Sequence, residues 1–235
     1  MSLQARVLEA LGTVYDPELD EPITALGFVG SCVLATEGEV EVRLRLPTPQ
    51  CAPNFAFLMA ADAAAAVRGV AGVRSVRVVL EDHYTREEIN GAVNRDAGFS
   101  EAFPGETAGD LRALRELFQR KALLARQSRL LSAAALTLGE LTGPDAERCR
   151  ALRRALGIDA SDEAPAFVTG DGTPVAASDV RFWRMASLTA LSLETNGGIC
   201  RDLLRTRTSR GPRPTGHSVM CDVPLGTPEG QEVAA

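Results

Sequence analysis

The spacing of apolar positions at the start of the chain is helical. Apolar side chains recur three or four residues apart at Val7, Leu11 and Val14. The pattern stops at Asp16, because Pro17 disfavours the helical conformation of the residue before it. We therefore expect a short first helix that ends before Pro17.

Strand-like patterns follow this helix. Residues 39–46 alternate strictly between apolar and charged side chains, which is typical of a strand with one buried face. A proline-rich loop then leads into an alanine-rich segment with helical character. The elements expected after the first helix are a strand, a strand, a helix and a strand, at residues 29–34, 39–46, about 54–68 and 73–80. This order predicts an α-β-β-α-β domain with a mixed three-stranded sheet.

Helical spacing returns in the second half of the chain, after an irregular stretch at residues 92–109. We expect helices at about 110–139, 144–157 and 178–194, the last one closed by Asn196-Gly197-Gly198. The fold class is therefore α+β, with a mostly α-helical C-terminal part. The predicted division is a domain of residues 1–94, a linker of 95–109, a helical domain of 110–205 and an irregular tail of 206–235.

Composition and charge exclude several classes of protein. The 235 residues are 45% hydrophobic and 24% charged, as in an ordinary globular protein. The formal net charge of −6 gives no general attraction for nucleic acid. The longest apolar stretch, 55–67, contains Asp62 and is shorter than the roughly 20 residues that span a bilayer, so no membrane partner is expected.

Two further observations favour a cytoplasmic location. The first twelve residues lack the continuous apolar core of a secretory signal. The five cysteines are widely spaced and include no Cys-x-x-Cys pair, which suits a reducing compartment.

Cys51 is the main candidate for chemistry. It lies in the proline-bounded loop just before a predicted helix, where free backbone N–H groups and the positive end of the helix dipole favour a thiolate. Thiolates bind iron and iron–sulfur clusters, and Asp16 and Glu18 could add carboxylates if their loop folds against that of Cys51. His83, after the third strand, is a further candidate metal ligand. The alternatives are a small buried thiol for Cys51 and a solvated acidic turn for residues 16–18.

The remaining candidates have simpler interpretations. Cys32 and Cys149 fit packed thiols, within a strand and on the apolar face of a helix. Cys200, His217 and Cys221 could form part of a metal site, although no fourth ligand accompanies them. The arginine-rich segment 201–213 is either a solvated tail or a docking surface for an acidic protein.

Four segments in the same order resemble a known family. They are Asp16-Pro17-Glu18-Leu19, Leu26-Gly27-Phe28-Val29, Thr48-Pro49-Gln50-Cys51-Ala52-Pro53 and the strand segment 69–78. Over about residues 4–94 the chain resembles the SufT- and PaaD-like iron–sulfur cluster assembly domain. Two positions depart from the family pattern: Ala52 separates Cys51 from Pro53, and Tyr84 stands near the usual tryptophan.

The resemblance implies a metallocluster maturation factor and not an enzyme. Such a protein holds iron or an iron–sulfur cluster transiently and helps it to reach a client apoprotein, here with Cys51 as the thiolate. The implied partners are the client, other iron–sulfur assembly proteins and a second copy of the chain, since related domains often form dimers. PaaD-like members resemble dedicated helpers of multicomponent oxygenases, and the added helical half would suit docking to such a client.

Two other functions remain open from the sequence. The first is a structural chaperone or assembly subunit that carries no metal and leaves Cys51 without a ligand role. The second is a thiol enzyme, which is disfavoured because a catalytic cysteine needs a base and the chain offers only His83 and His217.

Overall fold

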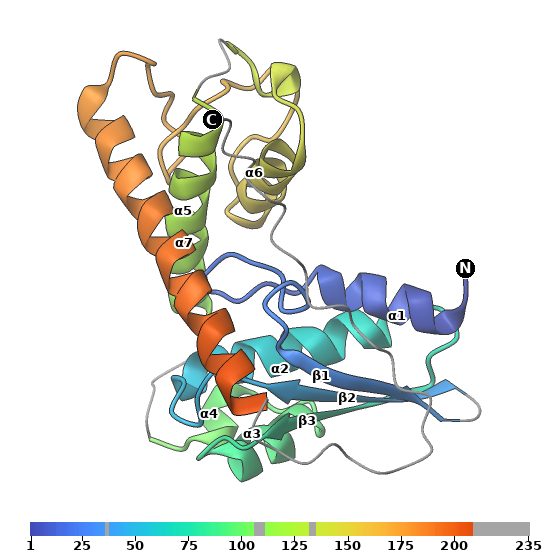
Figure 1. The fold of residues 1–235 in the computed structure, drawn as a ribbon. Coiled ribbons are helices and arrows are strands. Elements are labelled where there is room, and N and C mark those ends of the chain that lie inside the picture. The colour runs from blue at the N-terminus through green and yellow to red at the C-terminus, as the bar shows by residue number, and fades with distance from the viewer. Residues whose placement is uncertain (36–37, 106–110, 132–134, 209–235) are drawn as a thin grey trace, which may run out of the picture. The chain divides into compact units, whose positions relative to one another are not determined.

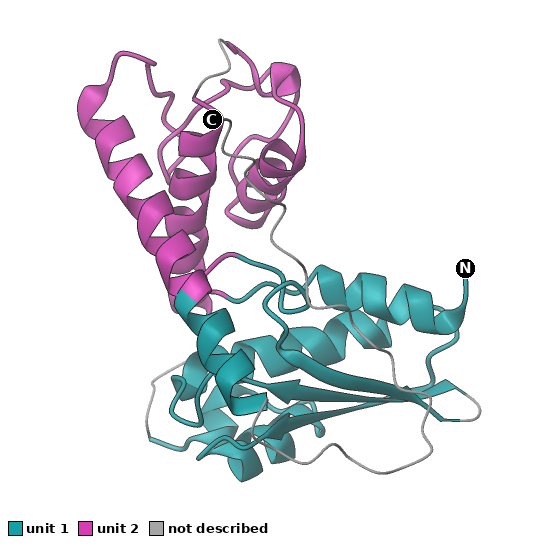
Figure 2. Ribbon diagram, viewed as in Figure 1, with its two compact units in different colours: residues 1–16, 21–109, 199–235 teal, residues 17–20, 110–198 magenta. Residues whose placement is uncertain are grey.

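The computed structural model describes residues 1–35, 38–105, 111–131 and 135–208. The chain forms two compact units, shown in different colours in Figure 2. Unit 1 comprises residues 1–16, 21–109 and the chain from 199 onward, and unit 2 comprises residues 17–20 and 110–198.

Unit 1 is built on a mixed three-stranded sheet (Figure 1). Its strands are β1 (Val29–Leu34), β2 (Glu39–Arg45) and β3 (Ser75–Glu81), in the order β1-β2-β3. β1 pairs with β2 antiparallel and β2 pairs with β3 parallel, so the crossover through α2 (Pro53–Arg68) joins two neighbouring strands. The α-β-β-α-β order and the mixed sheet expected from the sequence are confirmed.

The turn between β1 and β2 requires a glycine. Gly38 has φ +84°, and a Cβ there would lie 2.3 Å from the carbonyl oxygen of Gly72. The close approach is used, because the Gly38 carbonyl accepts a hydrogen bond from Arg74 N–H at 2.8 Å. A side chain at residue 38 would therefore separate this turn from the segment that leads into β3.

The buried positions of the sheet are those that the alternation predicted. Val40, Val42 and Leu44 of β2 are at most 3% exposed. α2 packs against β3, α3 and α1, and its alanines at 56, 60, 63 and 64 are all buried. The first helix, α1 (Leu3–Gly12), begins at the N-cap Ser2, packs on α2 and buries Val7 and Leu11.

The first helix ends earlier than Pro17 alone would require. After Gly12 the backbone pairs with a later segment: Asp16 N–H donates to the Glu21 carbonyl and Ile23 N–H to the Val14 carbonyl, both at 2.9 Å. These bonds satisfy backbone groups that would otherwise have continued the helix.

A short helix that the sequence did not indicate follows β3. α3 (Arg86–Val93) packs against α2 and β3, and α4 (Phe99–Ala102) packs against α3. The side-chain amides of Asn90 and Asn94 bond both the N–H and the carbonyl of Leu80 and of Val78. They occupy the outer edge of β3 as a further strand would.

Unit 2 is helical. Its elements are α5 (Arg112–Arg129), the 3₁₀ turn η2 (Leu138–Glu140), α6 (Pro144–Ala155) and the first part of α7 (Val180–Thr208). Trp183 and Phe167 pack edge to face at 4.9 Å between ring centres, within an apolar cluster that also includes Leu138 and Leu141.

Two predicted helix boundaries in the second half are wrong. The helix expected to reach residue 139 ends at Arg129, because residues 136–139 pair their backbone with 162–166 instead, as in the 2.7 Å bond from Leu138 N–H to the Ala164 carbonyl. The helix expected to close at residues 196–198 continues to Thr208. Beyond the two glycines, Leu204 is buried and Arg201 forms an ion pair with Glu21. These tertiary contacts outweigh the cost of about 1 kcal/mol for each glycine in a helix.

Among the helices within the described residues, none is long and apolar enough to cross a lipid bilayer.

Candidate functional site

Cys51 lies in the loop between β2 and α2, which we call the thiol loop (residues 47–52). Thr48 organises this loop. Its carbonyl accepts from Cys51 N–H at 3.4 Å, its hydroxyl accepts from Gln50 N–H at 3.2 Å, and the same hydroxyl oxygen lies 3.6 Å from the Cys51 sulfur. The Cys51 side chain is half-buried, so solvent and a partner can still reach it.

The thiol loop leads directly into the N-terminus of α2. Ala52 is the N-cap and offers no side-chain oxygen to the first N–H groups, and Pro53 begins the helix. Asn54 supplies one local acceptor, 2.9 Å from Phe55 N–H, but no acidic residue lies in the first turn. The first turn of this 16-residue helix, beside Cys51, thus supplies no carboxylate of its own to the positive end of the helix dipole.

His83 connects the end of β3 to the thiol loop. Its Nε2 lies 2.8 Å from the Cys51 carbonyl oxygen, and its Nδ1 lies 3.2 Å from the backbone nitrogen of Thr85. A carbonyl can only accept and an N–H can only donate, so the ring is neutral with its proton on Nε2. Burial lowers the pKa of His83, against the opposing effect of the bond to the Cys51 carbonyl.

This arrangement gives His83 a role different from the predicted one. Both ring nitrogens are hydrogen-bonded to the protein, and coordination of a metal by either would break one of these bonds. Its ligation of metal stays a prediction, whereas its contact with the backbone of Cys51 is present in the structure.

Tyr84 is the exposed neighbour of this pair. Its ring is 56% exposed and lies 4.9 Å from the His83 ring between centres, while its backbone N–H donates to the Pro49 carbonyl at 3.2 Å. The residue near the family's usual tryptophan therefore holds the thiol loop by its backbone and presents its side chain to solvent.

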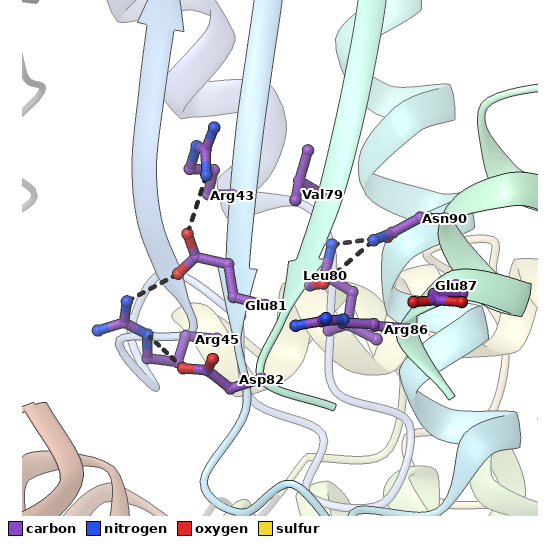
Figure 3. Close-up of a pocket in the computed structure, with 9 residues that line it drawn as sticks. All are labelled: Arg43, Arg45, Val79, Leu80, Glu81, Asp82, Arg86, Glu87 and Asn90. Carbon is purple, nitrogen blue, oxygen red and sulfur yellow. Dashed lines mark hydrogen bonds and ion pairs between the residues drawn. The ribbon is translucent and has the colours of Figure 1, made fainter. Parts of the chain in front are cut away.

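A cleft of about 540 Å³ opens beside β3 and α3 (Figure 3). Its charged side chains neutralise one another: Glu81 lies 3.2 Å from Arg43 and 2.8 Å from Arg45, and Arg45 lies 3.9 Å from Asp82. The cleft reaches Asp82, the residue directly before His83, and its paired charges favour no particular ligand.

The two predicted carboxylates fall in different compact units. Asp16 is buried in unit 1, whereas Glu18 belongs to the four residues grouped with unit 2. Within the part of the chain that the structure describes, no group of three or more His, Cys, Asp and Glu side chains could hold a metal ion. The involvement of Asp16 and Glu18 in cargo binding stays a prediction.

The other cysteines divide into two classes. Cys32 and Cys149 are buried, as expected, and desolvation raises the pKa of Cys149 to about 12. Cys200 is half-buried on α7. His217 and Cys221, its suggested companions in a metal site, lie outside the described residues, so this suggestion is not tested.

The arginine-rich segment is partly incorporated into the fold. Arg201 pairs with Glu21, and Arg207 contacts the Leu46 carbonyl and Asp82. Arg205 pairs with Asp202 on the surface of α7, and residues 209–213 lie outside the described residues. Sequence reasoning missed Thr85, and it singled out the arginine-rich segment that contains Arg207 without indicating the contacts of Arg207 with Leu46 and Asp82.

Comparison with known proteins points to one family. The family model described as "Iron-sulfur cluster assembly protein" matches residues 4–79. An uncharacterized protein of Methanocaldococcus jannaschii is 36% identical over 84 residues, which are 36% of this chain and 86% of that protein. No solved structure matches.

Proposed function

The chain belongs to the iron–sulfur cluster assembly protein family through its residues 4–79, and we propose that it is a maturation factor that passes iron or an iron–sulfur cluster to a client apoprotein. In this proposal the metal is cargo, and the protein is a carrier and not an enzyme. Cys51 is the thiolate that takes up the cargo.

One observation carries the proposal: a half-buried thiol in a loop braced by Thr48 and His83, at the uncapped N-terminus of α2. Backbone N–H groups and the positive end of the helix dipole attract negative charge at this position, and an iron–sulfur cargo bound through its thiolate ligands carries such charge. The bracing holds the thiol in place before the cargo arrives, so little ordering is needed on binding.

A single thiolate suits transfer better than storage. Iron–sulfur clusters are held by several cysteine ligands, and the described residues place no two further ligand-type side chains in a group with Cys51. The remaining ligands would come from the client or from a second copy of the chain. A cluster that each copy of the chain holds through a single cysteine can leave when the client supplies the remaining ligands.

The client and the location are finer parts of the proposal. A helical unit beyond the family-matched residues suits docking to one particular client, and a multicomponent oxygenase is the class that we propose. Free cysteines without disulfides among the described residues fit the reducing cytoplasm, where such clients are assembled.

A second candidate function is an assembly subunit that carries no metal. The lack of a three-residue ligand group in the described part of the chain favours it. In that case Cys51 packs against Thr48, and client maturation does not depend on its sulfur.

The two candidates differ in the effect of Cys51→Ser. The reduced protein is loaded anaerobically with iron(II) and sulfide, and absorption, metal content and transfer to a cluster-free acceptor are measured. Cys200→Ser is the matched control, because Cys200 is also half-buried. We expect Cys51→Ser to lose loading and transfer while Cys200→Ser retains both; equal loading in the wild type and both variants would contradict the carrier.

A further inference from the structure

Arg207, on the last turn of α7, contacts both chain segments that lead to Cys51. Its Nη1 donates to the carbonyl oxygen of Leu46 at 2.5 Å, and its Nη2 lies 3.7 Å from Oδ2 of Asp82. All of these residues belong to unit 1, with which the last turns of α7 are coloured in Figure 2. Arg207 lies far beyond residue 79, where the family match ends.

The two contacts lie where the strands end. Leu46 directly follows β2, and the thiol loop begins after it. Asp82 directly follows β3 and precedes His83, which bonds the Cys51 carbonyl. Because Arg45 and Glu81 are register partners, the two strands end side by side, and one guanidinium can reach both departing segments.

The two contacts act on different kinds of group. Leu46 is 2% exposed, and a buried carbonyl is costly to leave without a hydrogen bond. Asp82 has φ +52°, a left-handed conformation that reverses the chain just before His83. Oδ2 of Asp82 lies 3.7 Å from Arg207 and 3.9 Å from Arg45, so two positive charges attract the carboxylate of this 57% exposed side chain.

We infer that Arg207 is a positioning residue for Cys51. By tying Leu46 to Asp82, it keeps the loop that carries the thiol in register with the segment that carries His83. The inference rests on the proposed function, in which Cys51 takes up the cargo. Arg207 acts on Cys51 through these two segments, and the C-terminal part of the chain thereby contributes to a site that otherwise lies in the family domain.

Arg205 provides a matched control. It lies on the same last turn of α7 and carries the same charge, but its Nη1 pairs with Asp202 at 3.1 Å, and both side chains are at least half exposed. Loss of either arginine removes one positive charge from the C-terminal end of α7. Only the loss of Arg207 removes the contacts with Leu46 and Asp82.

The test is the rate at which iodoacetamide alkylates Cys51 in the reduced full-length chain at neutral pH, followed by mass spectrometry of the peptide. Cys51 is half-buried with its sulfur against Thr48, so a loosened loop exposes it more often. We expect Arg207→Ala to raise the alkylation rate by about fivefold or more, because the loss of a charge-assisted hydrogen bond lets the thiol loop open more often. Arg205→Ala should stay within about twofold of the wild type, as expected for an exposed pair.

Rescue distinguishes positioning from a general loss of structure. Arg207→Lys keeps the charge and can keep one of the two contacts, so its rate should lie between those of Arg207→Ala and the wild type. The buried Cys32, on β1 of the same unit, reports on the fold in the same sample and should stay unreactive. An unchanged Cys51 rate in Arg207→Ala, with Cys32 protected, would overturn the inference.

If Cys32 also reacts in Arg207→Ala, Arg207→Lys is compared with Arg205→Lys in its place. A rise confined to Cys51 in Arg207→Lys supports positioning, and equal rates in the two lysine variants overturn it. Alkylation requires neither iron nor a client. It therefore decides the role of Arg207 even if the Cys51→Ser variant still transfers the cluster and the proposed carrier function is wrong.

Discussion

A single neutral imidazole organises the surroundings of Cys51. His83 is 4% exposed, yet each of its ring nitrogens has a hydrogen-bonding partner, so its burial leaves no polar atom of the ring unpaired. The bond to the Cys51 carbonyl requires the proton on Nε2, and the bond from Thr85 requires an unprotonated Nδ1. Protonation of the ring would therefore break the bond from the Thr85 backbone N–H.

This predicts a stability that depends on pH. Burial lowers the pKa of His83 in the folded state, so the unfolded chain binds a proton more readily. The contribution of His83 is complete above its unfolded pKa of about 6.5 and is lost as the pH falls from there through the folded pKa. In urea unfolding between pH 7.5 and pH 5, the free energy of unfolding should fall more steeply with decreasing pH for the wild type than for His83→Asn. If the two proteins lose stability in parallel, the imidazole does not contribute to the pH dependence.

At the residue scale, the sequence located the thiol but not its support. Cys51 is predictable because proline-bounded loops before helices are local patterns. The partner of His83 is not, since the Cys51 carbonyl lies 32 positions away in sequence and the bond depends on β2 and β3 ending together.

α3 shows how a helix can protect the edge of a sheet. β3 is the last strand, and its outer N–H and carbonyl groups at Val78 and Leu80 are paired by Asn94 and Asn90. The two asparagines lie one helical turn apart and meet strand residues two apart, so the spacing of the helix matches that of the strand.

Removal of one of these amides should destabilise unit 1. Asn94→Ala leaves the N–H and the carbonyl of the fully buried Val78 without their side-chain partner, and we expect a loss of about 2 kcal/mol in the free energy of unfolding. Glu88→Ala, at an exposed position of the same helix, should change it by less than about 0.5 kcal/mol. Chemical denaturation of both variants measures the difference, and equal midpoints and slopes would refute the bridging role of Asn94.

At the element scale, the regular segments of the first domain were predictable and the boundaries in the second half were not. Alternation and helical spacing report the local burial of side chains, and β2 obeys them throughout. The end of α5 and the continuation of α7 are decided by backbone pairing and ion pairs with distant segments. Propensity is too weak to oppose these contacts.

Within unit 2, a buried carboxylate joins parts of the chain far apart in sequence. Asp20 accepts from Arg126 Nε at 2.7 Å and from Arg148 Nε at 2.9 Å, and its side chain is 4% exposed. Arg126 also bonds Asp145 at 2.7 Å. The Asp-Pro-Glu turn of the family pattern thus leads directly into a residue that α5 and α6 hold.

Neutralisation of Asp20 should lower the free energy of unfolding. Asparagine tolerates the left-handed backbone at residue 20, where φ is +53°. Asp20→Asn nevertheless leaves two partly buried guanidinium groups without their shared carboxylate, so we expect the free energy of unfolding to fall by about 2–3 kcal/mol. Asp162→Asn removes the ion pair between the exposed Asp162 and Arg150, whose atoms lie 3.8 Å apart. It should lower the free energy of unfolding by less than about 0.5 kcal/mol. Thermal and urea unfolding of the two variants provide the comparison; an Asp20→Asn protein as stable as Asp162→Asn would show that the pairing contributes little.

For the whole molecule, the sequence by itself determined the order of strands and helices from α1 to β3, the position of Cys51 before α2 and the family. Each of these depends on spacing along a short stretch of chain. Only the tertiary structure decided that Asn90 and Asn94 cover β3, that His83 donates to the Cys51 carbonyl, and that Arg207 ties Leu46 to Asp82. These contacts join residues through the way the strands and helices pack, and no local pattern carries that information.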